Sequence, residues 1–290
     1  MPQRVNIDVI PQVRDAVFDI ISSYPQGKRY CRYADLRLEI SEGKAAVAEN
    51  GMDKFSGEDY GFSFGVRVLA GDGLVAPGHF GQTLGAADLP ELAARLRQGL
   101  DHAYERARAN AGAKEAARQE LGPVAEALYS VELAPVEVRQ DTIPARYQTD
   151  PRQLPLAEAV QYVREVSRRL QGLDKGVAFN YVSAGTQLER TLFVSSQGTN
   201  VDQTWAITQG TCFVVAQGPD GHQELYDFTG HQRGWELISR GLEEDAIRFP
   251  SLMDFSLALA QDTVALAKAR PLPATDKDVV VVTDPHYNAL

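Results

Sequence analysis

The sequence predicts an α+β fold made of two modules of mainly antiparallel sheet packed with helices. Strand-like segments with a period of two occur in groups separated by short turns, which is typical of sequential hairpins. Amphipathic helices flank each group and do not alternate with single strands, so a regular βαβ winding is disfavoured. The order helix, strands, helix occurs twice, over residues 11–110 and 156–269.

Composition limits the classes of protein to which the chain can belong. It has 290 residues, 44% of them hydrophobic, which is enough for a large core in one or two domains. The net charge of -10 and the absence of a Lys/Arg cluster disfavour direct binding to nucleic acid. No apolar run is long enough to span a membrane, and the N-terminus lacks the apolar region of a signal peptide. We therefore expect a cytoplasmic protein.

The first module, residues 1–122, is predicted to begin with an amphipathic helix over residues 11–23. A strand over residues 33–41 follows, with alternating apolar and polar side chains. We expect one set of its side chains and those of a later strand to be buried, namely Leu36, Leu38, Ile40, Val66 and Val68. Arg37 and Glu39 point the other way and should be more exposed.

Turn residues divide the rest of this module. We predict turns at Glu42-Gly43, Asn50-Gly51 and Gly71-Asp72-Gly73, with strands over residues 44–49, 61–69 and 74–80. A helix is predicted over residues 89–110, with Asp88 as its N-cap and Glu91 completing a capping box. Residues 106–120 either prolong this helix or form a solvated connector, and Gly122-Pro123 ends it.

A Pro-rich junction, residues 123–155, is predicted to contain no regular element and to lead into the second module, residues 156–270. That module begins with a helix over residues 156–170 and ends with helices over about 232–240 and over 251–269. Between them we predict five strands, at Val177–Ala184, Gln187–Ser195, Asp202–Thr208, Thr211–Gln217 and Glu224–Thr229.

Residues 271–290 are interpreted as a linker and the first strand of a truncated C-terminal domain. The run Asp278–Thr283 contains four consecutive valines, which is typical of a strand buried on both faces.

The sequence contains no self-contained catalytic motif. None of the histidines is followed by Glu, and no two are spaced to share a helix face around zinc; they are His79, His102, His222, His231 and His286. Phosphate-binding loops and a GxSxG nucleophile elbow are also absent. We therefore assign no catalytic, cofactor-binding or metal-ligating residue to this chain.

Several single features have both a functional and a structural interpretation. His231, in the segment TGHQRG between a strand and a helix, either meets a substrate or is a loop or cap histidine, and the second interpretation is preferred. The Ser195–Gly198 segment is expected to be a polar turn, and Gly241–Asp245 a solvated turn without calcium. Trp205 and Trp235 are expected in the core or an interface. Both cysteines, Cys31 and Cys212, should be reduced, with Cys212 buried.

Four segments in consistent order resemble the TldD/PmbA family of metallopeptidases, whose older name is modulator of DNA gyrase. The first holds Tyr33-Ala34-Asp35-Leu36 and Gly65-Val66-Arg67-Val68, similar to the family's "Y-[AG]-D-[LV]" and "G-V-G-V-R-V" strands. The others are the meander over 177–217 with the Leu192–Gly198 turn, the Gly-rich passage Phe228–Glu236, and the helix over 251–269 followed by Lys277–Pro285.

The resemblance implies the N-terminal, chamber-forming region of a peptidase that acts on unfolded or small peptides and is not catalytic alone. In the family, a helix with an HExxxH-type motif follows the strand similar to Val279–Thr283 and, with a distant cysteine, holds the metal. That helix would begin where this chain ends, at Leu290. Zinc or a similar divalent metal is therefore expected only in the full-length family member.

Three functional hypotheses remain open. The chain is part of an active peptidase, a non-catalytic subunit that forms a homo- or hetero-dimer within the family, or a regulator of DNA gyrase or nucleic acid. An HExxxH motif beyond codon 290 would favour the first, and a stop codon there the second.

Overall fold

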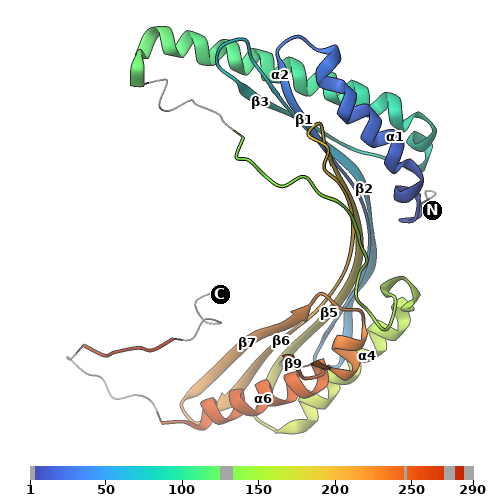
Figure 1. The fold of residues 1–290 in the computed structure, drawn as a ribbon. Helices are drawn as coiled ribbons and strands as arrows, with labels where there is room; N and C mark the ends of the chain where they lie inside the picture. The colour runs from blue at the N-terminus through green and yellow to red at the C-terminus, as the bar shows by residue number, and fades with distance from the viewer. Residues whose placement is uncertain (1–3, 125–132, 245–246, 271–277, 284–290) are drawn as a thin grey trace.

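A computed structural model describes residues 4–124, 133–244, 247–270 and 278–283 of the chain. Seven strands form one curled sheet in the order β3-β2-β1-β5-β6-β4, with β7 also paired to β6. All pairs are antiparallel except β4 with β6. Figure 1 shows the sheet as an arch with helices on its outer side at both ends. The predicted α+β class is confirmed.

The strands at the centre of the sheet are long. Those of the main sheet are β1 (Cys31–Glu49), β2 (Met52–Ala70), β3 (Ala76–Thr83), β4 (Gln140–Ile143), β5 (Val177–Ser195), β6 (Asn200–Gly218) and β7 (Gly221–His231). A small separate hairpin pairs β8 (Leu242–Glu244) with β9 (Ile247–Phe249). The hairpin occupies part of the predicted turn Gly241–Asp245, of which Asp245 lies outside the described residues.

The helices lie close to their predicted positions. They are α1 (Val9–Ser23), η1 (Tyr24–Gly27), η2 (Ala86–Glu91), α2 (Leu92–Leu121), η3 (Pro151–Gln153), α4 (Leu156–Leu173), α5 (Glu236–Arg240) and α6 (Leu252–Lys268). The stretch over residues 106–120 prolongs α2. Asp88 does not cap α2, because η2 precedes the α-helix; the Asp88 carboxylate accepts from the N–H of Gly85, the N-cap residue of η2.

Two hydrophobic cores lie on the outer, helix-covered face of the sheet. At one end α1 and α2 pack on Leu36, Leu38 and Ile40, all with 0% exposure. At the other end α4 and α6 pack on a second core that includes Val182 and Val214. Between the two cores, Lys44 Nζ donates to the carbonyl oxygens of Arg152 and Leu154, at 2.8 and 2.5 Å. This face therefore holds the apolar contacts that fix the fold.

The expectation of a separate sheet in each module is wrong. β1 pairs with β5 from Asp35↔Ser195 to Glu49↔Tyr181, so the strands of both halves share one sheet. Glu42-Gly43 is not a turn, because β1 continues through it with a partner on each side. The four strands predicted between Val177 and Gln217 are likewise only two, β5 and β6, because these strands pair with each other without interruption at the predicted breaks. The predicted turns at Asn50-Gly51 and at Ser195–Gly198 are confirmed.

Two predictions for the less regular regions are also corrected. The Pro-rich junction contains a strand, β4, which pairs in parallel with β6. Residues 278–283 are not in a strand, and Val279–Val282 are 61–92% exposed, because no described strand pairs with them. The predicted boundaries 1–122, 123–155, 156–270 and 271–290 stay a prediction. No helix in the described ranges is both long and apolar enough to cross a membrane.

Candidate functional site

The inner face of the sheet, which the described helices leave uncovered, contains a patch of small residues. Gly43 of β1 points inward, and so does Ala45, which is flanked by Gly57 of β2 and Gly185 of β5. Antiparallel partners point to the same side of a sheet, so these residues form one surface. Gly43 and Gly185 leave the backbone accessible at this place, whereas the Phe55 ring lies over Gly57, 3.1 Å from where a Cβ of that residue would be.

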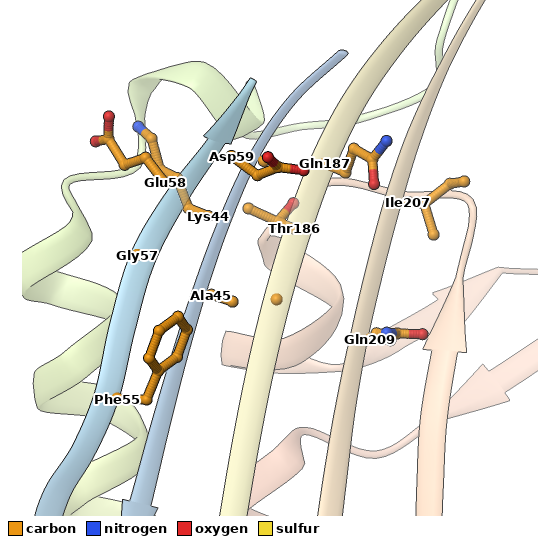
Figure 2. A pocket seen from close by; sticks show the side chains of 12 residues that line it. Lys44, Ala45, Phe55, Gly57, Glu58, Asp59, Thr186, Gln187, Ile207 and Gln209 are labelled. Atoms are coloured by element: carbon orange, nitrogen blue, oxygen red, sulfur yellow. The ribbon is translucent and has the colours of Figure 1, made fainter. Parts of the chain in front are cut away.

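These small residues form the floor of a cavity of about 610 Å³. Figure 2 shows the side chains of Asp59, Gln187 and Ile207 together near one end of this floor. Gln209, also on β6, borders the cavity further along the strand. With Phe55, which also lines it, the cavity therefore presents a carboxylate, two amides and two apolar side chains to any molecule that enters it.

The polar groups beneath the floor already have partners within the protein. Thr186 is buried, and its Oγ1 lies 2.6 Å from that of Thr208. Thr208 in turn donates to the Arg233 carbonyl oxygen at 2.9 Å. Because these hydroxyls bond to one another, they fix the sheet under the cavity and are not available to a ligand.

Exposed apolar side chains surround the small-residue floor on the same inner face. Phe55 and Phe228 lie in one cross-strand row, connected by Val47, Ser183 and Thr211. Among the described residues, the large apolar side chains that stay exposed on this face include Met52 (69%), Phe55 (61%), Ile207 (38%), Tyr226 (56%) and Phe228 (44%). A grouping of this kind is typical of a binding surface and does not contribute to the core.

The structure does not bring the predicted histidines together. His79 lies on β3, and His102 stacks on Phe80 with ring centroids 5.1 Å apart. His222 is exposed at the start of β7, and His286 lies outside the described residues. His231 was expected in a loop or cap, but it is the last residue of β7, because that strand runs two residues further than predicted, and its ring lies 5.3 Å from that of Phe249.

A second cavity, of about 380 Å³, lies beside His231 and includes Arg146, Trp205 and Arg233 in its walls. Arg233 is ion-paired with Glu244 at 2.5 Å, and this pair lowers the pKa of Glu244. The predicted setting of Trp235 in the core is confirmed, since it is 3% exposed. Trp205 is half-buried and donates to Glu189 at 3.1 Å.

The residue types do not fit a bound metal anywhere in the described ranges. Across residues 4–124, 133–244, 247–270 and 278–283, no group of three or more His, Cys, Asp or Glu side chains could hold an ion. Zinc needs about four such ligands in tetrahedral arrangement, or three and a water. We therefore derive no chemical step through a metal.

Both cysteines are free thiols. Burial raises the pKa of Cys212, which lies under α6, to about 11. Burial also raises the pKa of the half-buried Cys31 thiol. A thiol is nucleophilic only as the thiolate, so neither side chain is prepared for covalent catalysis.

The cavity on the inner face was missed by reasoning from the sequence. Gly43, Gly57 and Gly185 are far apart along the chain and become neighbours only when β1 pairs with both β2 and β5. Their alternation with larger residues could have indicated a strand face with little volume. The register that aligns them could not be read from local sequence.

Comparison with known proteins identifies the family of the central part of the chain. Residues 149–270 match the model of the PmbA/TldA metallopeptidase central domain. No curated protein matches the chain. Three solved structures are similar in fold at 11–12% identity.

TldE from Thermococcus kodakarensis gives a TM-score of 0.53, at 11% identity over 86% of this chain and 46% of that one. Two proposed modulators of DNA gyrase, from Bacteroides thetaiotaomicron and Thermotoga maritima, give TM-scores of 0.52 and 0.53, at 11% and 12% identity. The match to the Bacteroides protein covers 89% of this chain and 49% of that one. The match to the Thermotoga protein covers 91% of this chain and 50% of that one. The chain thus spans about half the length of these structures. Residues 149–270 form a PmbA/TldD metallopeptidase central domain, so this part of the chain belongs to the family that the sequence resembles.

Proposed function

We propose that this chain forms the substrate-binding wall of a TldD/PmbA-type metal-dependent peptidase that acts on unfolded or small peptides, and that it is not catalytic alone. The observation that carries this proposal is the open inner face of the sheet, where a cavity of about 610 Å³ lies among exposed apolar side chains. Cavities that bind small ligands usually have volumes of roughly 300–1,000 Å³.

The chemistry of this face suits an extended peptide. Phe55 and Ile207 offer apolar contacts to alternate side chains of a bound segment. Asp59, Gln187 and Gln209 offer carboxylate and amide groups to its backbone. The glycine floor lets the peptide backbone come close to the sheet, which a folded domain with its own surface side chains cannot do.

The proposal for the whole protein goes further. We infer a cytoplasmic dimer with another TldD/PmbA subunit, in which zinc or a similar metal is held by residues of a catalytic domain. The inferred organisation is an N-terminal module (1–122), a junction (123–155), a central module (156–270) and a linker that leads toward the catalytic domain (271–290). The same inner face would serve equally in a non-catalytic partner subunit, which is the alternative function.

Metal content separates this proposal from self-contained catalysis. We expect the 290-residue chain to bind no stoichiometric zinc and to cleave no peptide, because the described residues lack a ligand set. Elemental analysis after gel filtration measures this directly. About one tightly held metal per chain would contradict the proposal.

Peptide binding tests the wall itself. The probe is a short fluorescein-labelled peptide of alternating Phe and Ser residues, followed by fluorescence anisotropy. Ile207→Ser should weaken binding roughly tenfold, since loss of one well-buried apolar contact in the complex is worth about 1.4 kcal/mol. The matched control is Leu266→Ser on α6, where Leu266 is 42% exposed, close to the 38% of Ile207. Equal effects of the two substitutions would show that the inner face is not the binding surface.

A gyrase- or nucleic-acid-regulating function stays the third hypothesis. The net charge of -10 disfavours direct contact with DNA. Retention on a DNA column that falls with salt would support it.

A further inference from the structure

One edge of β6 is interrupted. Beside its first residues lies β4, whose last pair is Ile143↔Gln203, and beside its second half lies β7, whose pairing ends at Thr208↔His231. The stretch Thr204–Ile207 lies between them, and among the described residues no strand pairs with it on this side. We call this stretch of the β6 edge the gap.

Local chemistry keeps the gap open. Pro144 directly follows β4 and has no N–H, so β4 cannot continue its ladder along β6. The chain then turns away, and the N–H groups of Gln148 and Thr149 donate to the Glu236 carboxylate. At the other side of the gap the Arg233 N–H donates to the His231 carbonyl oxygen, which ends β7.

Backbone groups in the gap are available for pairing. On its other side the same stretch pairs with β5, from Arg190↔Thr204 to Gln187↔Ile207. An antiparallel strand bonds one neighbour with alternate residues, so the remaining N–H and C=O groups point to the opposite edge. There they face the second cavity, of about 380 Å³, which is lined by Thr204, Trp205 and Ala206. Unpaired strand edges of this kind accept an added strand.

The cavity is also charged to receive an anionic group. Arg146 is exposed in its wall, and among the described residues no carboxylate lies within 4.0 Å of its guanidinium, although Glu244 is near enough for its pKa to be lowered in part by Arg146. Arg233, the other arginine in the wall, is held by Glu244. A guanidinium binds a carboxylate through two parallel hydrogen bonds, which no other side chain matches in geometry.

We propose that the gap binds a short extended polypeptide segment, which pairs with Thr204–Ile207 as an added strand between β4 and β7. A carboxylate of that segment, from an acidic side chain or the C-terminus, is bound by Arg146. The inference deepens the proposed function, because it rests on a peptide as the ligand and names where its backbone pairs. The gap is as long as three to four residues of a strand, about 13 Å, so only that many residues of the bound segment pair with β6 here.

The test uses the 290-residue chain and a fluorescein-labelled peptide of sequence Thr-Val-Thr-Asp, acetylated at its N-terminus. Arg146→Gln should weaken its binding about tenfold, whereas Arg97→Gln, a matched exposed arginine on α2, should leave it unchanged. The same peptide with N-methylated amides should bind at least tenfold more weakly, because it cannot pair with a strand. The amide resonances of Thr204–Ile207 should shift on binding of the unmethylated peptide only.

The outcomes distinguish the gap from the inner face. Phe55→Ser should reduce binding of the Phe/Ser peptide but leave binding of the acidic peptide unchanged. If Phe55→Ser abolished binding of both peptides and Arg146→Gln had no effect on either, the gap proposal would be overturned and the proposed function would stay intact. Full competition by acetate at equal concentration, or equal binding of the methylated peptide, would also overturn it.

Discussion

The two faces of the same strands differ in what they contribute. On the helix-covered face Leu36, Leu38 and Ile40 are completely buried, while on the inner face of the same strand Arg37 is exposed. Each fully buried leucine stabilises the fold by about 1.5–3 kcal/mol. Stability therefore depends on one face, and the residues of the other can change with far smaller consequences for folding.

The inner face shows how that freedom is used. It keeps Met52, Phe55 and Tyr226 more than half exposed, where they add little to the fold. Monomeric proteins seldom expose grouped apolar side chains without a partner for them. The difference between the faces separates residues that hold the structure from residues that are available for binding.

The largest expected effect comes from placing a charge on each face. Leu38→Asp should lower the free energy of unfolding by about 4–5 kcal/mol, because it removes a buried apolar side chain and buries a carboxylate. Phe55→Asp should change it by less than about 1 kcal/mol, since that side chain is 61% exposed. Urea unfolding followed by circular dichroism measures both. Similar losses would mean that the inner face is covered in solution.

A single methyl group provides a finer comparison. A Cβ at Gly78 would lie 2.0 Å from the Ala103 carbonyl oxygen of α2, so Gly78→Ala should destabilise by about 1–3 kcal/mol. Gly65, on the inner side of β2, has nothing within 4 Å of its added Cβ. Gly65→Ala should be neutral or stabilise by up to about 1 kcal/mol, because it restricts the unfolded chain. Thermal unfolding of the pair gives the sign, and a destabilised Gly65→Ala would indicate a neighbour on the inner face.

At one end of the inner face Tyr33 is buried, and this burial should appear as a pH dependence of the free energy of unfolding. Burial and the nearby Asp35 carboxylate raise the pKa of Tyr33 to about 12, from 10.0. Asp35 in turn bonds Arg67 Nε at 2.9 Å. Because the folded state favours the neutral phenol, this contribution is complete below pH 10 and is lost as pH rises through about 12.

Tyr33→Phe should therefore show a shallower loss of stability than the unaltered chain between pH 9 and 11 in urea titrations. The control is Tyr226→Phe, because Tyr226 is 56% exposed. Its stability should fall with pH as steeply as that of the unaltered chain, which would assign the effect to the buried phenol of Tyr33. Identical slopes for all three proteins would mean that Tyr33 is solvated.

Features set by local sequence could be predicted. The Asn50-Gly51 turn has φ values of 48° and 74°, a backbone conformation that this pair adopts readily, so its position was correct. The alternation of Leu36, Leu38 and Ile40 likewise predicted which side is buried. Helix positions followed from apolar periodicity in the same way.

Features set by distant partners could not be predicted. Gly43 reads as a turn residue, but it lies within a strand because β2 and β5 pair on both sides of it. The four valines of 279–282 have strong strand propensity, but propensity does not supply a partner. Both cavities depend on strand register and on where pairing stops, and these are properties of the assembled sheet.

The last comparison leaves the sequence unaltered and measures how fast the thiols of Cys31 and Cys212 react. Cys212 is completely buried under α6 on the helix-covered face, and burial raises its pKa to about 11, whereas Cys31 is half-buried at the start of β1. Cys31 should react with Ellman's reagent at least about tenfold faster than Cys212 at pH 8, because the higher pKa and lower accessibility of Cys212 both reduce attack by its thiolate.

Reaction of Cys212 should accelerate with urea well below the unfolding midpoint only if α6 detaches locally. Cys31→Ser and Cys212→Ser assign the two phases, and the first is the milder control because its thiol packs at the margin of the core. If Cys212 reacted as fast as Cys31 in the absence of urea, α6 would not cover this end of the sheet in solution, and the contrast between the two faces would fail there.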